Sequence, residues 1–340
     1  MRLAFSETSI RRTVRRIERR TAIVKTAFEK RHGNAPTPYQ DDEQLDKYIE
    51  REGSIVRYRW REPLPSDQPR PKNTLVLLSG WTCHPCMYTP IIPMLNRNHA
   101  ILNIENKGHW KSTMGKSNDR TYLSDMAMDT HAALTRHDDN KVVLVGHSMG
   151  GLVSLKFHSM FPDQVAGVVM ICAPYKNPLE TWMFGNDPIV NVALKLLSHS
   201  IELNGPIIDA VKRNFFAKSF IMQELGRIIV EGIGNTEING SFEKLFDKFM
   251  RTNSEAFAIA FRAMLRENED GLDQLKESGL PVLVITGQND VIVSSRAWAK
   301  IIHQLPNAKL VTLPVGHLPT MEAPEETIRL IDEFARGCKF

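Results

Sequence analysis

The sequence has few cysteines, no long apolar run and little net charge, and each shortage excludes a class of protein. Four cysteines in 340 residues are too few for a disulfide scaffold, so we expect a reducing compartment. No apolar run approaches the roughly 18 residues of a membrane-spanning helix, and the N-terminus lacks the apolar centre of a secretory signal. A net charge of +4 gives no reason to expect nucleic acid as a partner. We therefore expect a cytoplasmic protein.

Apolar runs of strand length recur along most of the chain. Because 42% of its 340 residues are hydrophobic, the chain can bury a large core. The main runs are residues 75–78, 100–102, 142–145, 165–171, 282–285 and 310–311. Helix-length segments separate them, which is typical of strands buried on both faces of a parallel sheet. Alternating segments at 48–51 and 55–60 predict an antiparallel hairpin before the first run. The fold class is therefore α/β, with a mostly parallel central sheet flanked by helices.

The interval 175–270 breaks this alternation because it contains no strong strand candidate. Helical spacing recurs instead at residues 189–197, 207–216, 219–230, 242–250 and 255–266. We therefore expect a helical cap at 175–270, inserted into a core that is built from residues 39–174 and 271–340.

The first 38 residues differ from the rest of the chain in charge. Six arginines lie close together there, namely Arg11, Arg12, Arg15, Arg16, Arg19 and Arg20. Apolar residues recur at helical spacing between them, at Ile10, Val14, Ile17, Val24 and Phe28. Residues 1–38 thus predict a basic amphipathic helix followed by a linker. Its apolar face is expected to pack on the main domain or, as the alternative, to contact an anionic membrane, which would make the protein membrane-associated.

A strand, a sharp turn and a helix meet at the sequence Gly146-His147-Ser148-Met149-Gly150. The apolar run 142–145 precedes it, and residues 152–161 have helical spacing. This is the G-x-S-x-G pattern, in which Gly146 and Gly150 lack side chains so that the backbone can turn tightly and expose the serine hydroxyl at a helix N-terminus. We expect Ser148 to be a nucleophile. His147 is expected to pack or hydrogen-bond locally and not to act as the base.

A serine hydroxyl becomes a good nucleophile only when a base takes its proton and a carboxylate orients that base. Two residues further along the chain meet this need. Asp290 comes just after the run 282–285, and His317 comes just after the run that includes 310–311. Open α/β sheets place functional loops at the carboxyl ends of their strands. We therefore predict that Asp290 orients His317 and that His317 is the general base for Ser148.

With this motif and this order of Ser, Asp and His, the chain resembles the α/β-hydrolase superfamily from about residue 48 to its end, and in particular capped serine esterases and lipases. The resemblance implies that the backbone N–H groups of Trp81 and Met149 form the oxyanion hole. The family usually has His-Gly in the loop before this position, whereas this chain has Ser79-Gly80. The change leaves open which hydrogen bonds support the loop.

A second family pattern, Asp-x-Arg-Gly-His-Gly-x-Ser, is matched loosely by Glu105-Asn106-Lys107-Gly108-His109-Trp110-Lys111-Ser112. We interpret His109 in this segment as a turn residue and not as a catalyst. Cys83 and Cys86, just after Trp81, have the spacing of a redox pair. We interpret them as packing thiols, with a regulatory disulfide as the alternative.

The predicted activity is hydrolysis of a small-molecule carboxylic ester through an acyl-enzyme, with no metal and no cofactor. A hydrophobic acyl group is expected because the predicted cap is rich in apolar residues, among them Phe215, Phe216, Phe220, Ile221, Met222, Phe246 and Phe249. The same triad also supports thioester hydrolysis, cofactor-free perhydrolysis and carbon–carbon bond hydrolysis. A non-catalytic binding protein of the same fold is a further alternative. Epoxide hydrolases and haloalkane dehalogenases are excluded because their nucleophile is aspartate. The oligomeric state is not indicated by the sequence.

Overall fold

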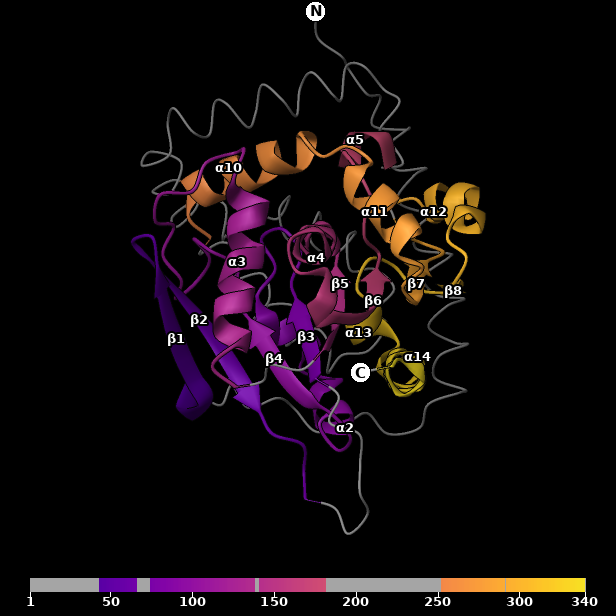
Figure 1. The fold of residues 1–340 in the computed structure, drawn as a ribbon, viewed down its shortest axis with the longest axis horizontal. Coiled ribbons are helices and arrows are strands. Elements are labelled where there is room, and N and C mark those ends of the chain that lie inside the picture. The colour runs from indigo at the N-terminus through magenta and orange to yellow at the C-terminus, as the bar shows by residue number, and fades with distance from the viewer. Residues whose placement is uncertain (1–42, 66–73, 138–140, 182–251, 291, 340) are drawn as a thin grey trace, which may run out of the picture.

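A computed structural model describes residues 43–65, 74–137, 141–181, 252–290 and 292–339 of the chain (Figure 1). Its centre is an eight-stranded sheet in the order β1-β2-β4-β3-β5-β6-β7-β8. The strands are β1 Asp46–Arg51, β2 Ser54–Arg61, β3 Thr74–Leu78, β4 Ala100–Ile104, β5 Val142–His147, β6 Val165–Ile171, β7 Val282–Gly287 and β8 Ala308–Leu313. All neighbours from β4 to β8 pair in parallel, whereas β1 and β2 are antiparallel. The predicted α/β class, the hairpin and the mostly parallel sheet are confirmed.

The burial of each strand follows its place in the sheet. Every residue of β3, β4, β5, β6 and β7 is buried, because neighbouring strands and helices cover both faces. The edge strand β8 differs, since only Leu313 in it is buried. The expectation that residues 310–311 are buried on both faces was therefore wrong. A strand at the edge has a neighbour on one side only, and in β8 Lys309 and Thr312 are exposed while Ala308, Leu310 and Val311 are half-buried.

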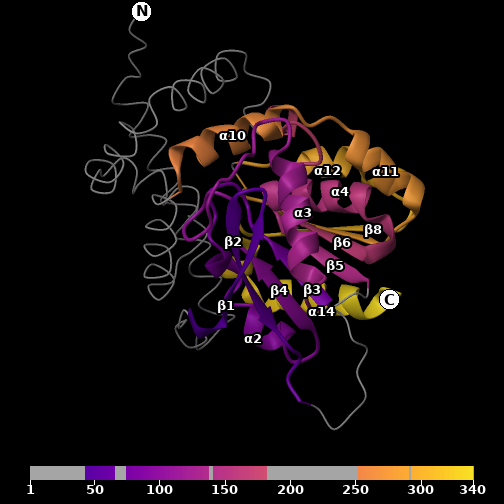
Figure 2. The same cartoon turned by 60° about the vertical axis from the view of Figure 1, so that its left-hand side comes forward.

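Two helical layers cover the sheet, as Figure 2 shows. Alternate strand residues such as Val76 and Leu78 pack against one layer, and Leu75 and Leu77 pack against the other. The first layer contains α3 Tyr122–Leu134, α4 Met149–Met160, α10 Ser254–Leu265, α11 Asp270–Ser278 and α12 Ser295–Ile301. The second contains η2 Pro85–Tyr88, α2 Ile92–Leu95, α13 Pro319–Glu322 and α14 Pro324–Gly337. The short elements η1 Glu43–Leu45, η3 Pro162–Gln164, α5 Pro178–Thr181 and η5 Ile302–Gln304 complete the described chain.

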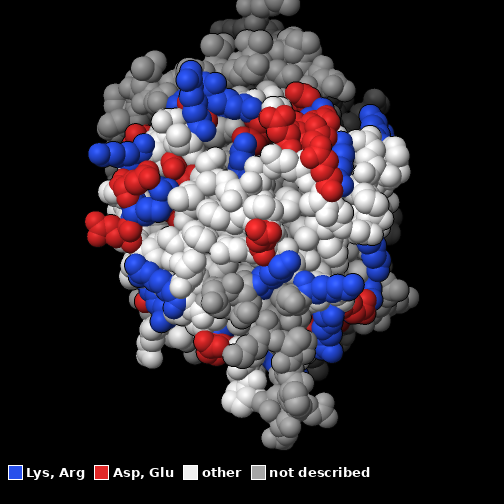
Figure 3. Space-filling model, viewed as in Figure 1, with Lys and Arg blue, Asp and Glu red and all other residues white. Residues whose placement is uncertain are grey.

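Of the five helices predicted for the cap, one lies within the described residues. The expected helix at 255–266 is α10, and Asn253 caps it by accepting hydrogen bonds from the backbone N–H groups of Glu255 and Ala256. The four predicted helices between 189 and 250 lie outside the described residues, as do the N-terminal helix and linker at 1–38. Helices within the described ranges are all too short or too polar to cross a membrane. On the face in Figure 3, basic and acidic side chains are interspersed among uncharged ones.

Candidate active site

Ser148 lies on a strained turn between β5 and α4. Its φ of 52° and ψ of −121° are rare for a residue with a side chain, and such outliers concentrate at functional sites. The turn packs directly on backbone. A Cβ at Gly146 would overlap the carbonyl group of Gly150, and a Cβ at Gly150 would overlap the carbonyl oxygen of Leu78. The structure therefore requires glycine on both sides of the serine, as the G-x-S-x-G pattern indicates.

Asp290 and His317 are brought together by the loops that follow β7 and β8. The Nδ1 of His317 lies 2.8 Å from Oδ2 of Asp290, and both residues are buried. The other carboxylate oxygen accepts hydrogen bonds from the backbone N–H groups of Ile292 and Val293, at 2.8 and 3.0 Å. Burial alone would raise the pKa of Asp290, but His317 and these hydrogen bonds outweigh it and keep the pKa below its ordinary value. Asp290 is thus ionised at neutral pH and accepts the Nδ1–H of His317, which leaves Nε2 available to a substrate or a hydroxyl group.

His147, beside the serine, makes the local hydrogen bond that we expected. Its Nε2–H donates to the backbone carbonyl of His317 at 2.7 Å, and the two rings meet edge to face with centroids 4.7 Å apart. Burial, followed by the proximity of His317, lowers the pKa of His147 to about 3. His147 is therefore neutral, and its Nε2–H links the serine turn to the His317 loop.

The loop after β3 is supported by two side chains of the 105–112 segment. The amide nitrogen of Asn106 donates to the carbonyl of Gly80 at 2.8 Å. His109 accepts a hydrogen bond from the backbone N–H of Thr82 at Nε2, at 3.2 Å, and donates from Nδ1 to the carbonyl of Lys107. His109 is thus the turn residue that we expected, with an additional contact to this loop. Asn106 was not singled out from the sequence, and its only signal there was its place in a family pattern.

The two backbone N–H groups that the resemblance implicates lie on this loop and on the serine turn. A Cβ placed on Gly80 would lie 3.0 Å from Cβ of Ser148, so the loop abuts the turn. Among the residues that the structure describes, none accepts a hydrogen bond from the N–H of Trp81 or Met149. The Met149 N–H lies at the N-terminus of α4, where negative charge is favoured.

Trp81 also connects the loop to α10. Its indole Nε1–H donates to the carbonyl of Phe257 in α10 at 3.0 Å. Its ring packs against Phe257 and Phe261, with centroid separations of 4.4 and 4.9 Å. An aromatic surface therefore adjoins the loop that carries the Trp81 N–H.

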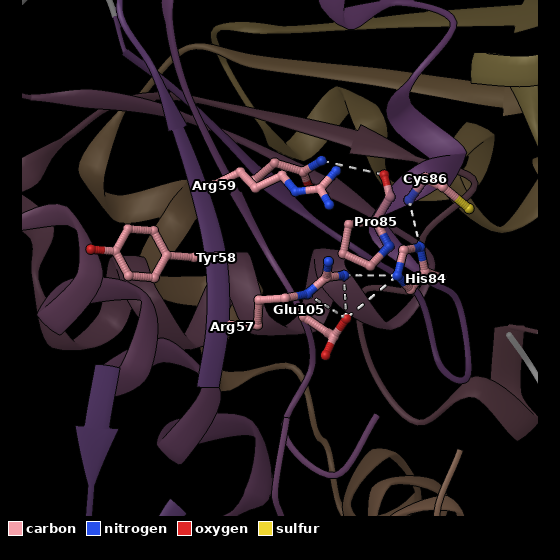
Figure 4. Close-up of a pocket in the computed structure, with 8 residues that line it drawn as sticks. Arg57, Tyr58, Arg59, His84, Pro85, Cys86 and Glu105 are labelled. Atoms are coloured by element: carbon pink, nitrogen blue, oxygen red, sulfur yellow. Dashed lines mark hydrogen bonds and ion pairs between the residues drawn. The ribbon is translucent and has the colours of Figure 1, made fainter. Parts of the chain in front are cut away.

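A buried polar cluster of Arg57, His84 and Glu105 lines a small cavity (Figure 4). Glu105 accepts hydrogen bonds from the backbone N–H groups of Lys111 and Ser112, both at 2.8 Å, and pairs with Arg57. Arg57 also lies 2.8 Å from Nε2 of His84. The cavity measures about 10 Å³, which is room for about one water molecule. The hydrogen bonds of this cluster therefore fix the 105–112 segment, and the cavity beside it is too small to bind a substrate.

Cys172, Asp290 and His317 are the residues in the described ranges whose ligand atoms are close enough to hold a metal ion, within 4.8 Å of one another. Burial, and then the negative charge of Asp290, raises the pKa of the Cys172 thiol well above its ordinary value. The thiol of Cys172 donates to the carbonyl of Gly316, and the Nδ1 of His317 donates to Asp290. This set therefore fits a hydrogen-bonded cluster better than a metal centre.

Cys83 and Cys86, in the loop after β3, are not joined in a disulfide. Burial, and then the proximity of Cys86, raises the pKa of Cys83 to about 12. Since the thiolate is the reactive form, Cys83 is a poor nucleophile at neutral pH. This favours the packing interpretation over a regulatory disulfide.

Comparison with known proteins gives one family. The sequence model of the alpha/beta hydrolase family matches residues 75–330. The monoacylglycerol lipase ABHD6 of Mus musculus is 22% identical over 296 residues, which are 83% of this chain and 82% of the lipase. The pimeloyl-[acyl-carrier protein] methyl ester esterase of Wigglesworthia glossinidia brevipalpis is 22% identical over 268 residues, 77% of this chain and 93% of the esterase. Among solved structures, a thermophilic esterase from Thermogutta terrifontis has a TM-score of 0.64 and 21% identity, covering 86% of this chain and 98% of that one.

Proposed function

This chain belongs to the alpha/beta hydrolase family, and we propose that it is a serine hydrolase that cleaves carboxylic esters through an acyl-serine intermediate. The observation that carries the proposal is the buried 2.8 Å hydrogen bond between His317 and Asp290, in loops adjoining the strained turn of Ser148. The relatives of this chain include a monoacylglycerol lipase and a methyl ester esterase, and both names denote hydrolysis of carboxylic esters.

In the proposed mechanism, the Oγ of Ser148 attacks the ester carbonyl while Nε2 of His317 takes the hydroxyl proton. Asp290, ionised in its buried site, stabilises the imidazolium that forms. The N–H groups of Trp81 and Met149 stabilise the negative oxygen of the tetrahedral intermediate. His317 then gives its proton to the leaving alcohol. Water, deprotonated by the same nitrogen, releases the acid and restores the serine.

We further propose that the acyl group is hydrophobic. The half-buried rings of Trp81 and Phe257 pack together beside the proposed oxyanion hole, with Phe261 buried against the Trp81 ring, so an acyl chain that extends from the carbonyl towards α10 meets apolar side chains. Monoacylglycerol and pimeloyl esters, named for two relatives, also carry acyl chains.

The test combines covalent labelling with a substrate series. The full chain should react with a serine-directed fluorophosphonate, and Ser148→Ala should remove the label. Turnover of p-nitrophenyl esters should rise in kcat/KM from the acetate to chains of medium length. Turnover by Ser148→Ala at the wild-type rate would contradict the proposed mechanism. Loss of wild-type activity on treatment with a chelator would contradict it as well. A preference for the acetate would contradict the hydrophobic acyl group alone.

A further inference from the structure

We propose that Glu322 is a positioning residue, whose carboxylate fixes the loop of His317 and thereby aligns its imidazole between Asp290 and Ser148. The inference rests on the proposed function for its kinetic consequences. Its structural basis, however, is independent of the substrate.

The carboxylate of Glu322 binds the backbone on both sides of His317. One oxygen accepts the N–H of Gly316, and the other accepts the N–H of Leu318 at 2.8 Å. Glu322 is 3% exposed, at the end of the short helix α13. A Cβ on Gly316 would lie only 3.1 and 3.2 Å from the two carboxylate oxygens, so the glycine gives the carboxylate room to approach the loop.

The carbonyl groups of Gly316 and His317 are bound from other elements. The thiol of Cys172, just after β6, donates to the carbonyl of Gly316 at 3.7 Å. His147, at the end of β5, donates to the carbonyl of His317. Glu322 instead accepts from the backbone N–H groups of Gly316 and Leu318, so one side chain satisfies two buried donors. Its loss would leave both donors without their acceptors, which is costly in a buried site.

Above pH ~7, where Glu322 with its pKa of about 7 is ionised, its carboxylate suits this position better than a neutral group does. Each of its two oxygens is an acceptor, whereas the isosteric amide of glutamine has one acceptor and one donor. The donor of glutamine would face an N–H group and repel it. One half of the loop would then lose its partner, and the imidazole of His317 would shift relative to Asp290. A displacement of about 1 Å at a reacting group can cost about 100-fold in rate.

The matched variants are Glu322→Gln and Thr320→Val. Both positions lie on α13 and are buried, and both substitutions preserve the size of the side chain. The hydroxyl of Thr320 has no hydrogen-bond partner among the described residues, so Thr320→Val changes the helix without removing a hydrogen bond from the His317 loop. At pH 8, where Glu322 is ionised, we expect Glu322→Gln to lower kcat and the rate of fluorophosphonate labelling about 10- to 100-fold, with KM changed less than about twofold. We expect Thr320→Val to keep both rates within about twofold of wild type.

A spectroscopic readout separates positioning from general destabilisation. The proton between Nδ1 of His317 and Asp290 should give a strongly downfield ¹H NMR signal, assigned by its absence in His317→Ala. In folded Glu322→Gln, below its melting temperature, this signal should shift or broaden, whereas Thr320→Val should keep it unchanged. An unchanged signal together with wild-type kcat in Glu322→Gln would overturn the inference. If the wild-type protein neither labels nor hydrolyses esters, the proposed function fails, and the NMR comparison still decides the role of Glu322.

Discussion

The side chain of His147 donates a hydrogen bond to the backbone carbonyl of His317 across a sequence separation of 170 residues. The residue next to the proposed nucleophile thus contacts the residue that we propose as its base. The serine turn is fixed as well, because the N–H of Ser148 donates to the carbonyl of Ile171 at 3.0 Å in β6. The sheet therefore holds Ser148 through β6, and the hydrogen bond from His147 additionally ties the residue beside Ser148 to the His317 loop.

The proposed triad predicts a ranking of three substitutions. Ser148→Ala and His317→Ala should each lower kcat by about 10⁶-fold, and the double variant should be no worse, because triad members act as a unit. Asp290→Asn should lower kcat by about 10⁴-fold, since it mainly disturbs the tautomer of His317. Single-turnover kinetics on the three variants and the double variant measure the ranking. Additive losses in the double variant would argue against a shared mechanism.

Loss of the hydrogen bond from His147 to His317 should lower kcat less than loss of a proposed triad residue does. His147→Phe removes the donor, whereas His147→Gln keeps an N–H donor on a side chain of different shape. We expect His147→Phe to lower kcat about tenfold or more and His147→Gln to lose less. Because the pKa of His147 is about 3, neither variant should alter the pH dependence of kcat/KM above pH ~5. A shift of the acid limb of that profile in His147→Gln would show that His147 titrates during turnover, contrary to its assignment as a neutral donor.

We propose that Asn106 supports the oxyanion hole, and Asn103 provides a matched control for this role. Asn106→Ala removes the donor to the carbonyl of Gly80, and Asn103→Ala removes a similar buried donor, to Pro85, beside the small cavity. Both variants should lose stability, but only Asn106→Ala should also lower kcat, by about 10- to 100-fold, because the Trp81 N–H moves from its position. Thermal melting and kcat measured together separate the two effects. Equal losses of kcat would mean that Asn106 has no special role.

The buried carboxylate of Glu322 predicts how stability depends on pH. Burial raises its pKa from 4.5 to about 7, against the hydrogen bonds from Gly316 and Leu318 and the charge of His317, while Asp290 adds to the increase. Cys172, which also lies near it, stays a neutral thiol. The folded protein therefore binds a proton more tightly than the unfolded chain does. The stability from this proton is fully present below pH ~4.5 and is lost as pH rises to about 7, by roughly 3 kcal/mol.

Urea unfolding of wild type and Glu322→Gln between pH 4 and 8 measures this effect. Glutamine does not titrate, so only the wild-type protein loses this stabilisation as pH rises. The unfolding free energy of wild type minus that of Glu322→Gln should therefore decrease between pH 4 and 8. Other titrating groups are common to both proteins and cancel in the difference. A difference that is constant over this range would mean that Glu322 has an ordinary pKa.

Local patterns in the sequence were sufficient for the sheet strands, the helix at α10 and the choice of Ser148, Asp290 and His317 as candidates. Apolar runs specify strands because a buried strand needs apolar residues on both faces, and G-x-S-x-G specifies a turn because only glycine fits beside its backbone. The exposure of β8 could not be read in this way, since an edge strand can have the same apolar residues as a central one.

The contacts that support the candidate residues depended on the tertiary structure. Asn106 and Gly80 meet because β3 and β4 are parallel neighbours in register, with their carboxyl ends at one edge of the sheet. Glu322 is only six residues from Gly316, yet an acidic residue after a strand usually lies in solvent. Its role follows from burial, because α13 packs against the sheet and leaves the two N–H groups of the His317 loop as the partners of its carboxylate. Sequence spacing fixes which residues are neighbours along the chain, but only packing decides which polar groups lose their contact with water and must therefore bind one another.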